Sequence, residues 1–431
     1  MKKIIMVLAA GLLLAPAVFA GGGPEEETGP ITLTYWTHED PNRTALEERL
    51  IAEFESANPD VTIERVTHAS SRIPELVLTA FAANQGPDIF NLQIEDEYAY
   101  IANRRVAPVN PESVGYGSVS ELQNAYMKGV LDPVSVDGQI YGLPLELTNW
   151  SIFVNDRVFR DAGLNPDTDY PKTWEEMVEV SEKLVIRDGD ILTRRGFDFR
   201  YPYYLVAMVP MVEQLGGELI SPDGTEAIVG EQPWISFLRF MQEWGPNGKN
   251  LGSPTYRNAR SLFNHDNNDI AMAHTGLYQQ GRIKADNPEF FDSGEWRVIP
   301  FPVFEDAVQD TAASYYGHYL MVNGQAPSRR QDMAWRFIAY MLQHSEEYLE
   351  KVGLIQPTKA LMNSDLYKSM PYSDVFSADM ERAHVVYYAG NSAKLQELIK
   401  KAVESVMLGG ITPEKAYATL KAEAQELIDE G

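Results

Sequence analysis

Residues 31–90 read ITLTYWTHEDPNRTALEERLIAEFESANPDVTIERVTHASSRIPELVLTAFAANQGPDIF, and the pattern of these residues predicts the fold class. Its segments 31–36 (ITLTYW) and 61–66 (VTIERV) are rich in β-branched and aromatic residues, which favours strands. Between them, residues 44–57 place apolar side chains at helical spacing. The turn residues Asn58-Pro59-Asp60 predict where that helix ends.

A second helix and a third strand complete the pattern. We expect the helix over residues 73–83, and residues 87–90 (PDIF) open the strand. The alternation of strands and helices predicts an α/β fold with a mainly parallel sheet and helices packed on it. Ligands of such sheets lie beyond the carboxyl ends of the strands, where the residues after Trp36 and after Phe90 fall.

The composition is that of a large, acidic, globular protein. The chain has 431 residues, 44% hydrophobic and 23% charged, so two domains are expected. Its formal net charge, 36 basic minus 62 acidic residues, is −26. This charge repels phosphate backbones and anionic lipids, which argues against nucleic acid as a partner. The absence of cysteine excludes disulfides, thiolate metal sites and cysteine nucleophiles.

The first twenty residues have the layout of a secretory signal peptide. Lys2 and Lys3 precede an apolar run over residues 4–14, and Ala20 ends a small-residue cleavage pattern. Residues 21–29 then predict a flexible leader, because they are mostly Gly, Pro and Glu. We therefore expect an exported, periplasmic protein that is not a lipoprotein.

Four groups of motifs, spread over nearly the whole chain, resemble one known family. They are residues 33–36 (LTYW) with 58–61 (NPDV), then 86–90 (GPDIF), then 137–144 (DGQIYGLP) with 171–176 (PKTWEE), and finally 269–272 (DIAM), 299–302 (IPFP) and 334–338 (AWRFI). In this order they resemble the extracellular sugar-binding proteins that serve ATP-driven (ABC) importers, the solute-binding family 1 that includes maltose-binding proteins.

The resemblance implies two α/β lobes that are joined by crossing strands and close on a sugar. The implied first lobe comprises residues 30–142 and 302–355, and the second comprises 143–301 and 356–431. The implied function is to bind a sugar or oligosaccharide and deliver it to the membrane subunits of an ABC transporter. We expect no catalysis, no cofactor, no metal and a monomeric chain.

The candidate ligand-binding residues that follow strands are polar or aromatic. A sugar needs planar rings for its C–H faces and polar groups for its hydroxyls. The strand ends and the first crossing supply Trp36, His38, Glu39, Asn91, Gln93, Glu95, Glu146 and Asn149.

Tyrosine clusters supply the other candidates. Tyr204 lies in FRYPYYL just before an expected helix. The resemblance implies ligand-facing positions for Tyr278, Tyr316 and Tyr387, and each cluster is expected to place one ring in the cleft and another in the core. An anionic sugar remains an alternative ligand, because five arginines are candidates for the cleft: Arg72, Arg200, Arg257, Arg282 and Arg382.

Two other functions remain open from the residues alone. A ferric-iron carrier has the same two-lobed fold, and Tyr315-Tyr316 and Tyr387-Tyr388, with His38 or Glu39, offer iron ligands. A secreted carbohydrate-active enzyme needs two opposed carboxylates, and 62 acidic residues make chance pairs unavoidable. The chain has no Gly-x-Ser-x-Gly elbow, phosphate loop or His-Glu-x-x-His motif, which argues against an enzyme.

Overall fold

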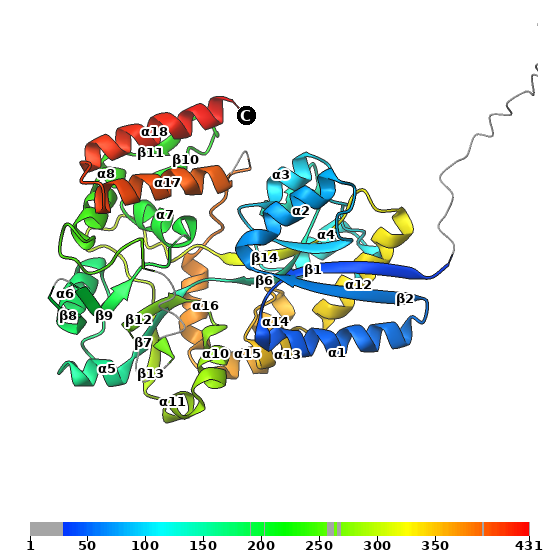
Figure 1. Ribbon diagram of the computed structural model, residues 1–431, viewed down its shortest axis with the longest axis horizontal. Helices are drawn as coiled ribbons and strands as arrows, with labels where there is room; N and C mark the ends of the chain where they lie inside the picture. Colours follow the sequence, from blue (N-terminus) through cyan, green and yellow to red (C-terminus); the bar gives the residue numbers. More distant parts are fainter. Residues whose placement is uncertain are drawn as a thin grey trace, which may run out of the picture.

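The protein folds into two lobes, each built around a five-stranded sheet (Figure 1). The computed structural model describes residues 29–189, 191–201, 203–256, 263–264, 269–389 and 392–430. The predicted signal peptide and residues 21–28 of the predicted leader lie outside these ranges. The predicted two-lobed α/β fold is confirmed.

The first sheet has the strand order β2-β1-β3-β14-β6. Its strands are β1 (Ile31–His38), β2 (Val61–His68), β3 (Ile89–Gln93), β6 (Leu143–Thr148) and β14 (Tyr316–Val322). The helices of this lobe are α1 (Pro41–Ala57), α2 (Ile73–Ala82), α3 (Glu97–Ala102), α4 (Val119–Ala125), α12 (Ser328–Gln343) and α13 (Ser345–Val352). Short elements are η1 (Ser70–Arg72), η2 (Glu112–Val114), η3 (Asp132–Val134), β4 (Ser135–Val136) and β5 (Gln139–Ile140).

The second sheet has the strand order β13-β7-β12-β9-β8. Its strands are β7 (Ser151–Asn155), β8 (Ile186–Asp188), β9 (Ile191–Asp198), β12 (Ile270–Thr275) and β13 (Trp296–Ile299). Its helices are α5 (Asp156–Asp161), α6 (Trp174–Leu184), α7 (Tyr204–Gln214), α8 (Glu231–Trp244), α10 (Gln279–Asp286), α11 (Pro288–Ser293), α17 (Ser392–Met407) and α18 (Pro413–Asp429). A small hairpin of β10 (Glu218–Ile220) and β11 (Ala227–Val229) lies beside them.

The sheets are mixed rather than mainly parallel, which corrects that part of the sequence prediction. In the first sheet β1 pairs in parallel with β2 and β3, but β14 pairs antiparallel with both of its neighbours. In the second sheet β7 is antiparallel to both β12 and β13. The reason is the connectivity, because β14 and β7 are the strands that enter their lobes from the other lobe. β14 and β7 are therefore antiparallel to the neighbouring strands, which end at the lobe boundary.

Helix α16 (Ser373–Arg382) anchors two of the connecting segments, and α14 (Lys359–Asn363) and α15 (Asp365–Ser369) precede it near the middle of the molecule (Figure 1). The carboxylate of Asp379 accepts hydrogen bonds from Ser151 Oγ (2.7 Å) and from the backbone N–H of Phe301 (2.9 Å). Ser151 begins β7, and Phe301 follows β13. A third segment, after α13, is tied to β6 by a hydrogen bond from the Leu147 N–H to the Ile355 carbonyl (2.9 Å).

Local sequence signals explain the element boundaries. The Thr173 hydroxyl caps α6 by accepting from the Glu176 N–H (3.1 Å). The Asp40 carboxylate caps α1, and Pro41 occupies the first turn, where its missing N–H costs nothing. In the second lobe, the fully buried Trp174 packs against Phe199 and Phe301.

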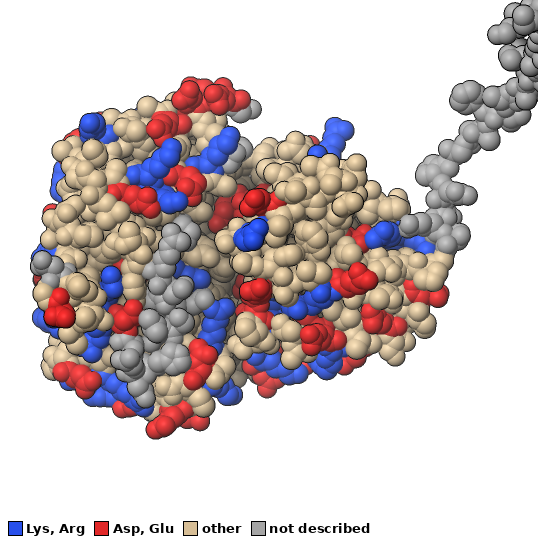
Figure 2. Space-filling model, in the orientation of Figure 1, with Lys and Arg blue, Asp and Glu red and all other residues tan. Residues whose placement is uncertain are grey.

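The surface carries charges of both signs. Figure 2 shows acidic and basic side chains interspersed over one face of both lobes. Among the described residues, no helix combines the length and apolar character that a membrane span requires.

Candidate functional site

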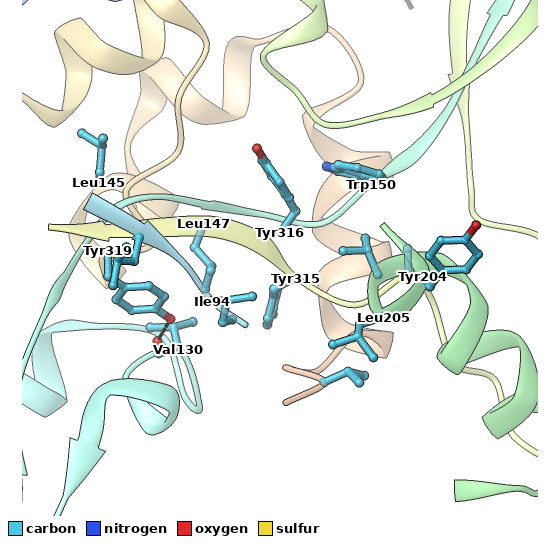
Figure 3. Close-up of a cluster of buried hydrophobic side chains, with 14 of the residues drawn as sticks. Ile94, Val130, Leu145, Leu147, Trp150, Tyr204, Leu205, Tyr315, Tyr316 and Tyr319 are labelled. Atoms are coloured by element: carbon cyan, nitrogen blue, oxygen red, sulfur yellow. Dashed lines mark hydrogen bonds between the residues drawn. The ribbon is translucent and has the colours of Figure 1, made fainter. Parts of the chain in front are cut away.

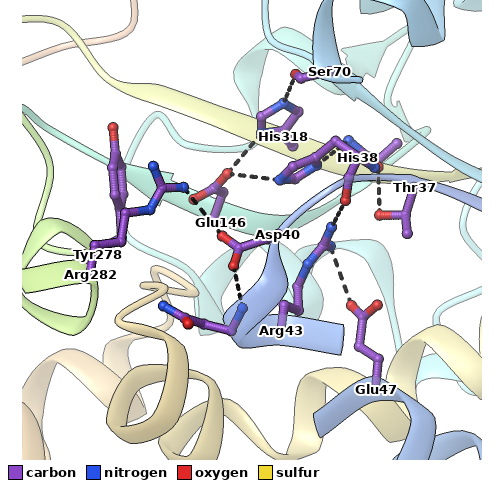
Figure 4. A network of polar contacts seen from close by, with 12 residues as sticks. Thr37, His38, Asp40, Arg43, Glu47, Ser70, Glu146, Tyr278, Arg282 and His318 are labelled. Atoms are coloured by element: carbon purple, nitrogen blue, oxygen red, sulfur yellow. Dashed lines mark hydrogen bonds and ion pairs between the residues drawn. The ribbon is translucent and has the colours of Figure 1, made fainter. Parts of the chain in front are cut away.

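Four strands of the first sheet bring a group of buried polar side chains to the edge that faces the second lobe (Figure 4). The group consists of His38 from β1, Asn91 from β3, Glu146 from β6 and His318 from β14. His318 Nδ1 lies 2.8 Å from Glu146 Oε1, and His38 Nε2 lies 3.7 Å from the same oxygen. The two imidazole rings stack with their centroids 4.0 Å apart.

Neighbouring groups fix the orientation of both imidazoles. The amide oxygen of Asn91 accepts from Thr37 Oγ1 (2.8 Å) and from the His38 N–H (3.1 Å). Its amide nitrogen therefore faces His38 Nδ1 (3.1 Å), which places the ring proton of His38 on Nε2, toward Glu146. His318 Nε2 lies 3.1 Å from Ser70 Oγ. The ring edges near Glu146 are thus held in place before any ligand arrives.

Burial and neighbouring charges set the protonation of the group. Burial raises the pKa of Glu146, but the hydrogen bond from His318 and the charges of His318, Arg43 and Arg282 lower it overall. The pKa of His38 lies well below its ordinary value, first because of burial and then because of His318 and Arg43. At neutral pH the site therefore combines a carboxylate acceptor with a neutral imidazole.

The second lobe faces this group with α10 and the residue before it. Arg282 Nη2 lies 3.5 Å from Asp40 Oδ2, a contact that joins α10 to the N-terminus of α1. The guanidinium of Arg282 also lies over the Tyr278 ring, 5.2 Å from its centroid. Figure 4 shows Tyr278 and Arg282 on the side of Glu146 that is opposite to His38.

Aromatic rings form the other part of the interlobe region. Tyr316, which begins β14, lies 5.1 Å from Trp150, 5.4 Å from Tyr203 and 6.4 Å from Tyr278, measured between ring centroids. It also meets His318 edge-on at 5.4 Å, which makes the aromatic and polar groups continuous. Figure 3 shows the ring of Tyr316 on the same side of the chain as Trp150, whereas the ring of Tyr315 lies on the opposite side.

Arg200 lies among these rings. Its guanidinium carbon is 4.4 Å from the Trp150 ring centroid and 4.7 Å from that of Tyr203. Its Nη1 donates to the Tyr278 hydroxyl (2.7 Å). Arg200 follows β9, whose carboxyl end faces the first lobe.

The structure brings some of the predicted residues into these two groups. His38, Asn91 and Glu146 meet in the polar group, and Tyr278 and Tyr316 meet in the aromatic group. A separate contact joins Glu95 to the second lobe through Gln396 Nε2, at 3.4 Å from its Oε1.

The other predicted residues have different surroundings. Trp36 is half-buried and meets His68 edge-on, and Glu39 is exposed. Gln93 pairs with His318 through the β3–β14 ladder, and Asn149 donates to the Phe376 carbonyl on α16 (3.2 Å). Two tyrosines remain. Tyr204 packs near Tyr201. Tyr387 is half-buried, and its pKa is raised first by burial and then by the charge of Asp132.

The groups also contain residues that the sequence prediction did not select. Trp150, Tyr203, His318 and Asp40 all take part. Arg200 and Arg282, which the sequence analysis named as possible partners of an anionic sugar, also lie in these groups. A signal existed for His318, since it lies two residues after Tyr316, and for Tyr203, which is in the same cluster as Tyr204. Trp150 lies between β6 and β7, and no local pattern distinguishes it from a core tryptophan.

His38, Glu146 and His318 have the donor types of a divalent metal site, and their ligand atoms lie within 4.8 Å of one another. The ring geometry argues against this use. The two imidazoles are nearly parallel, with 20° between their planes. Lone pairs that lie in two stacked planes cannot meet at one ion about 2.0–2.1 Å from each nitrogen. The arrangement instead offers acceptors and donors to hydroxyl groups, beside rings that can cover an apolar face.

The comparisons with known proteins agree with this architecture. Residues 49–371 match the family described as bacterial extracellular solute-binding protein. A binding protein of Brucella abortus is 20% identical over 386 residues, which cover 87% of this chain and 88% of the relative. The arabinooligosaccharide-binding protein of Halalkalibacterium halodurans is 22% identical, over 76% of this chain and 70% of the relative.

Solved structures share the fold. An ABC transporter solute-binding protein from Thermotoga lettingae, bound with α-D-tagatose, has a TM-score of 0.78 at 18% identity, covering 92% of this chain and 99% of that one. A substrate-binding protein from Listeria monocytogenes in complex with cycloalternan has a TM-score of 0.76 at 19% identity, with the same coverage. Because the family match extends over most of the sequence, the chain belongs to the bacterial extracellular solute-binding proteins.

Proposed function

We propose that the chain binds a sugar or oligosaccharide between its two lobes and delivers it to the membrane subunits of an ABC transporter. Relatives named for arabinooligosaccharide and lactose binding support the ligand class. The same proposal includes a protein that acts outside the cytoplasm, as a monomer without a lipid anchor. It also includes the lobe boundaries predicted above, with the first one moved to the end of β6. Because Leu143–Thr148 pairs with β14 in the first sheet, the lobes become residues 30–148 with 302–355 and 149–301 with 356–431.

One observation carries the proposal: aromatic rings and hydrogen-bonding groups from both lobes are buried against each other. Tyr316 and Glu146 come from the first sheet, and Tyr278 from the second lobe, and all three are less than 9% exposed. Rings can stack on the C–H faces of a sugar while Glu146 and His318 bond to its hydroxyls. A ligand reaches these groups when the lobes separate, and it favours the closed form because it contacts both sides.

A thermal-shift screen of the exported chain against monosaccharides and oligosaccharides tests the proposal. A ligand that binds only the folded state increases the free energy of unfolding, by about 2.7 kcal/mol when its concentration is 100 times its dissociation constant. The melting temperature rises as a result. The variant Tyr278→Ala should weaken the response to the best sugar by about 1–3 kcal/mol, because an aromatic anchor is lost. The matched control is Tyr170→Ala, which removes a half-buried tyrosine of the second lobe outside the two groups of the site. A panel in which no carbohydrate shifts the melting temperature contradicts the proposal.

The same samples test the two other functions. Burial raises the pKa of Tyr315 to about 12 and that of Tyr316 well above its ordinary value, which opposes the phenolate form that iron prefers. We therefore expect no ferric-iron-dependent colour. The family consists of binding proteins, so we also expect no reducing sugar to be released from oligosaccharides during long incubation.

A further inference from the structure

Arg200 carries a positive charge that no acidic side chain of the described residues neutralises. Its contacts are the rings of Trp150, Tyr203 and Tyr316 and the hydroxyl of Tyr278. A guanidinium has five N–H donors, and one of them is used by Tyr278. The remaining donors include an edge that can hold a planar acceptor through two hydrogen bonds.

The neighbouring arginines of the interlobe region differ in this respect. Arg43 lies 3.3 Å from Glu47, and Arg282 lies 3.5 Å from Asp40. The chain has 62 acidic residues and a net charge of −26, so carboxylates are abundant. Arg200 is therefore distinctive, because it is partly buried among aromatic rings and has no carboxylate partner among the described residues. A partly desolvated charge without a counter-ion costs free energy that a ligand of opposite charge recovers.

The surroundings define which anion fits. One free guanidinium matches one negative charge, and Arg282 is already committed to Asp40. A phosphate monoester carries nearly two charges and usually has more than one cationic partner. A carboxylate is planar, singly charged and matches the guanidinium edge. The rings around Arg200 suit the C–H face of a pyranose, and Glu146 with His318 suits its hydroxyls.

We propose that the ligand is an acidic sugar of the uronate class, whose carboxylate pairs with Arg200 among the rings of Trp150, Tyr203 and Tyr316. This inference rests on the proposed function and narrows its ligand class. In the closed form the carboxylate occupies the second-lobe side of the site, and the sugar hydroxyls face the polar group of the first lobe.

Calorimetric titration of the full exported chain with matched ligands tests this inference. The ligands are glucuronate, galacturonate and their short oligomers, against glucose, galactose and their oligomers, with glucose 6-phosphate as the phosphate arm. We expect one of the uronates to bind at least about tenfold more tightly than its neutral counterpart, and more weakly as salt increases. This comparison uses the unaltered protein and does not depend on the folding of any variant.

Variants then locate the effect. Arg200→Gln should lower the uronate affinity by at least about tenfold, and Arg200→Lys should restore only part of it, because lysine lacks the planar fork. Arg336→Gln, which removes an exposed charge on α12, is the matched control and should leave the affinity unchanged.

The possible outcomes separate this inference from the proposed function. Neutral sugars that bind as tightly as uronates overturn the uronate assignment and leave sugar binding intact. Tighter binding of glucose 6-phosphate overturns the carboxylate in favour of a phosphate ester. If no carbohydrate of either kind binds, both the inference and the proposed function are wrong.

Discussion

At the scale of single residues, the interlobe region shows how burial controls charge. Glu146 stays ionised because His318 bonds to it, although burial alone would favour its neutral form. Asn91 holds His38 so that its ring proton faces Glu146. Neither residue could be assigned this role from the sequence, because the partners lie on strands that are far apart in the chain.

Glu97 in α3 shows the opposite behaviour. It is fully buried, and its two carboxylate oxygens have no hydrogen-bond partner within the described residues. Burial, with the charges of Glu95 and Asp96, raises its pKa well above the ordinary value. Because the pKa of Glu97 is higher in the folded state, its contribution to the free energy of unfolding is fully present below about pH 4. This contribution is lost as the pH rises through the pKa that Glu97 has in the folded state.

We therefore expect Glu97→Gln to stabilise the protein at pH 7, where glutamine avoids the ionisation that folding opposes. The free energy of unfolding should rise by about 1–3 kcal/mol at pH 7 and change little at pH 4. Urea unfolding at the two pH values measures this. The control Glu48→Gln, on the exposed face of α1, should have no effect at either pH. A loss of stability at pH 7 would show that Glu97 has a stabilising partner.

At the scale of elements, a buried ion network fixes α1 against β2. Glu47 lies 3.3 Å from Arg43 and 2.7 Å from Arg65, and it also accepts from Tyr348 on α13 (3.2 Å). Arg43 in turn donates to the carbonyl of His38. The network therefore supports the strand end that carries the polar group of the site.

Removing Glu47 should be strongly destabilising, because two arginines lose their counter-ion in the protein interior. We expect Glu47→Gln to lower the free energy of unfolding by about 3–5 kcal/mol, measured by urea denaturation. Glu53→Gln, which removes an exposed partner of Arg49 on the same helix, is the matched control and should leave the midpoint nearly unchanged. Equal effects of the two substitutions would contradict the role given to the network.

The elements also show which parts of the fold the sequence could predict. β1 and α1 were predicted because alternation and the helical spacing of apolar residues are local signals. β12 and β14 were not predicted as strands, since every residue in them is buried and the alternation disappears. The contact of Arg200 with Trp150 joins residues fifty positions apart, and its lack of a carboxylate partner becomes visible only in three dimensions.

At the scale of the whole molecule, polar contacts between described residues bridge the lobes. Two that lie at the interlobe region are the Asp40–Arg282 ion pair and the hydrogen bond from Gln396 to Glu95. Both form only when the lobes are close together, so they stabilise the closed form without a ligand. Three connecting segments form the hinge about which the lobes open. Two of these segments are anchored to α16 through Asp379.

Arg282→Ala should weaken sugar binding by about two- to fivefold, because the closed form loses one of its bridges. Calorimetry with the best ligand of the screen measures this change. The control Arg239→Ala breaks an exposed ion pair with Glu414 inside the second lobe and should leave the affinity unchanged. An affinity that is unaltered by Arg282→Ala would mean that this contact does not contribute to closure.

We expect the two lobes to close on a carbohydrate that both of them contact. Small-angle X-ray scattering of the exported chain, with and without a saturating sugar, measures this closure. We predict that the radius of gyration decreases when the sugar binds, because the population shifts from open to closed forms. A sugar that binds in calorimetry but leaves the scattering curve unchanged would contradict this account.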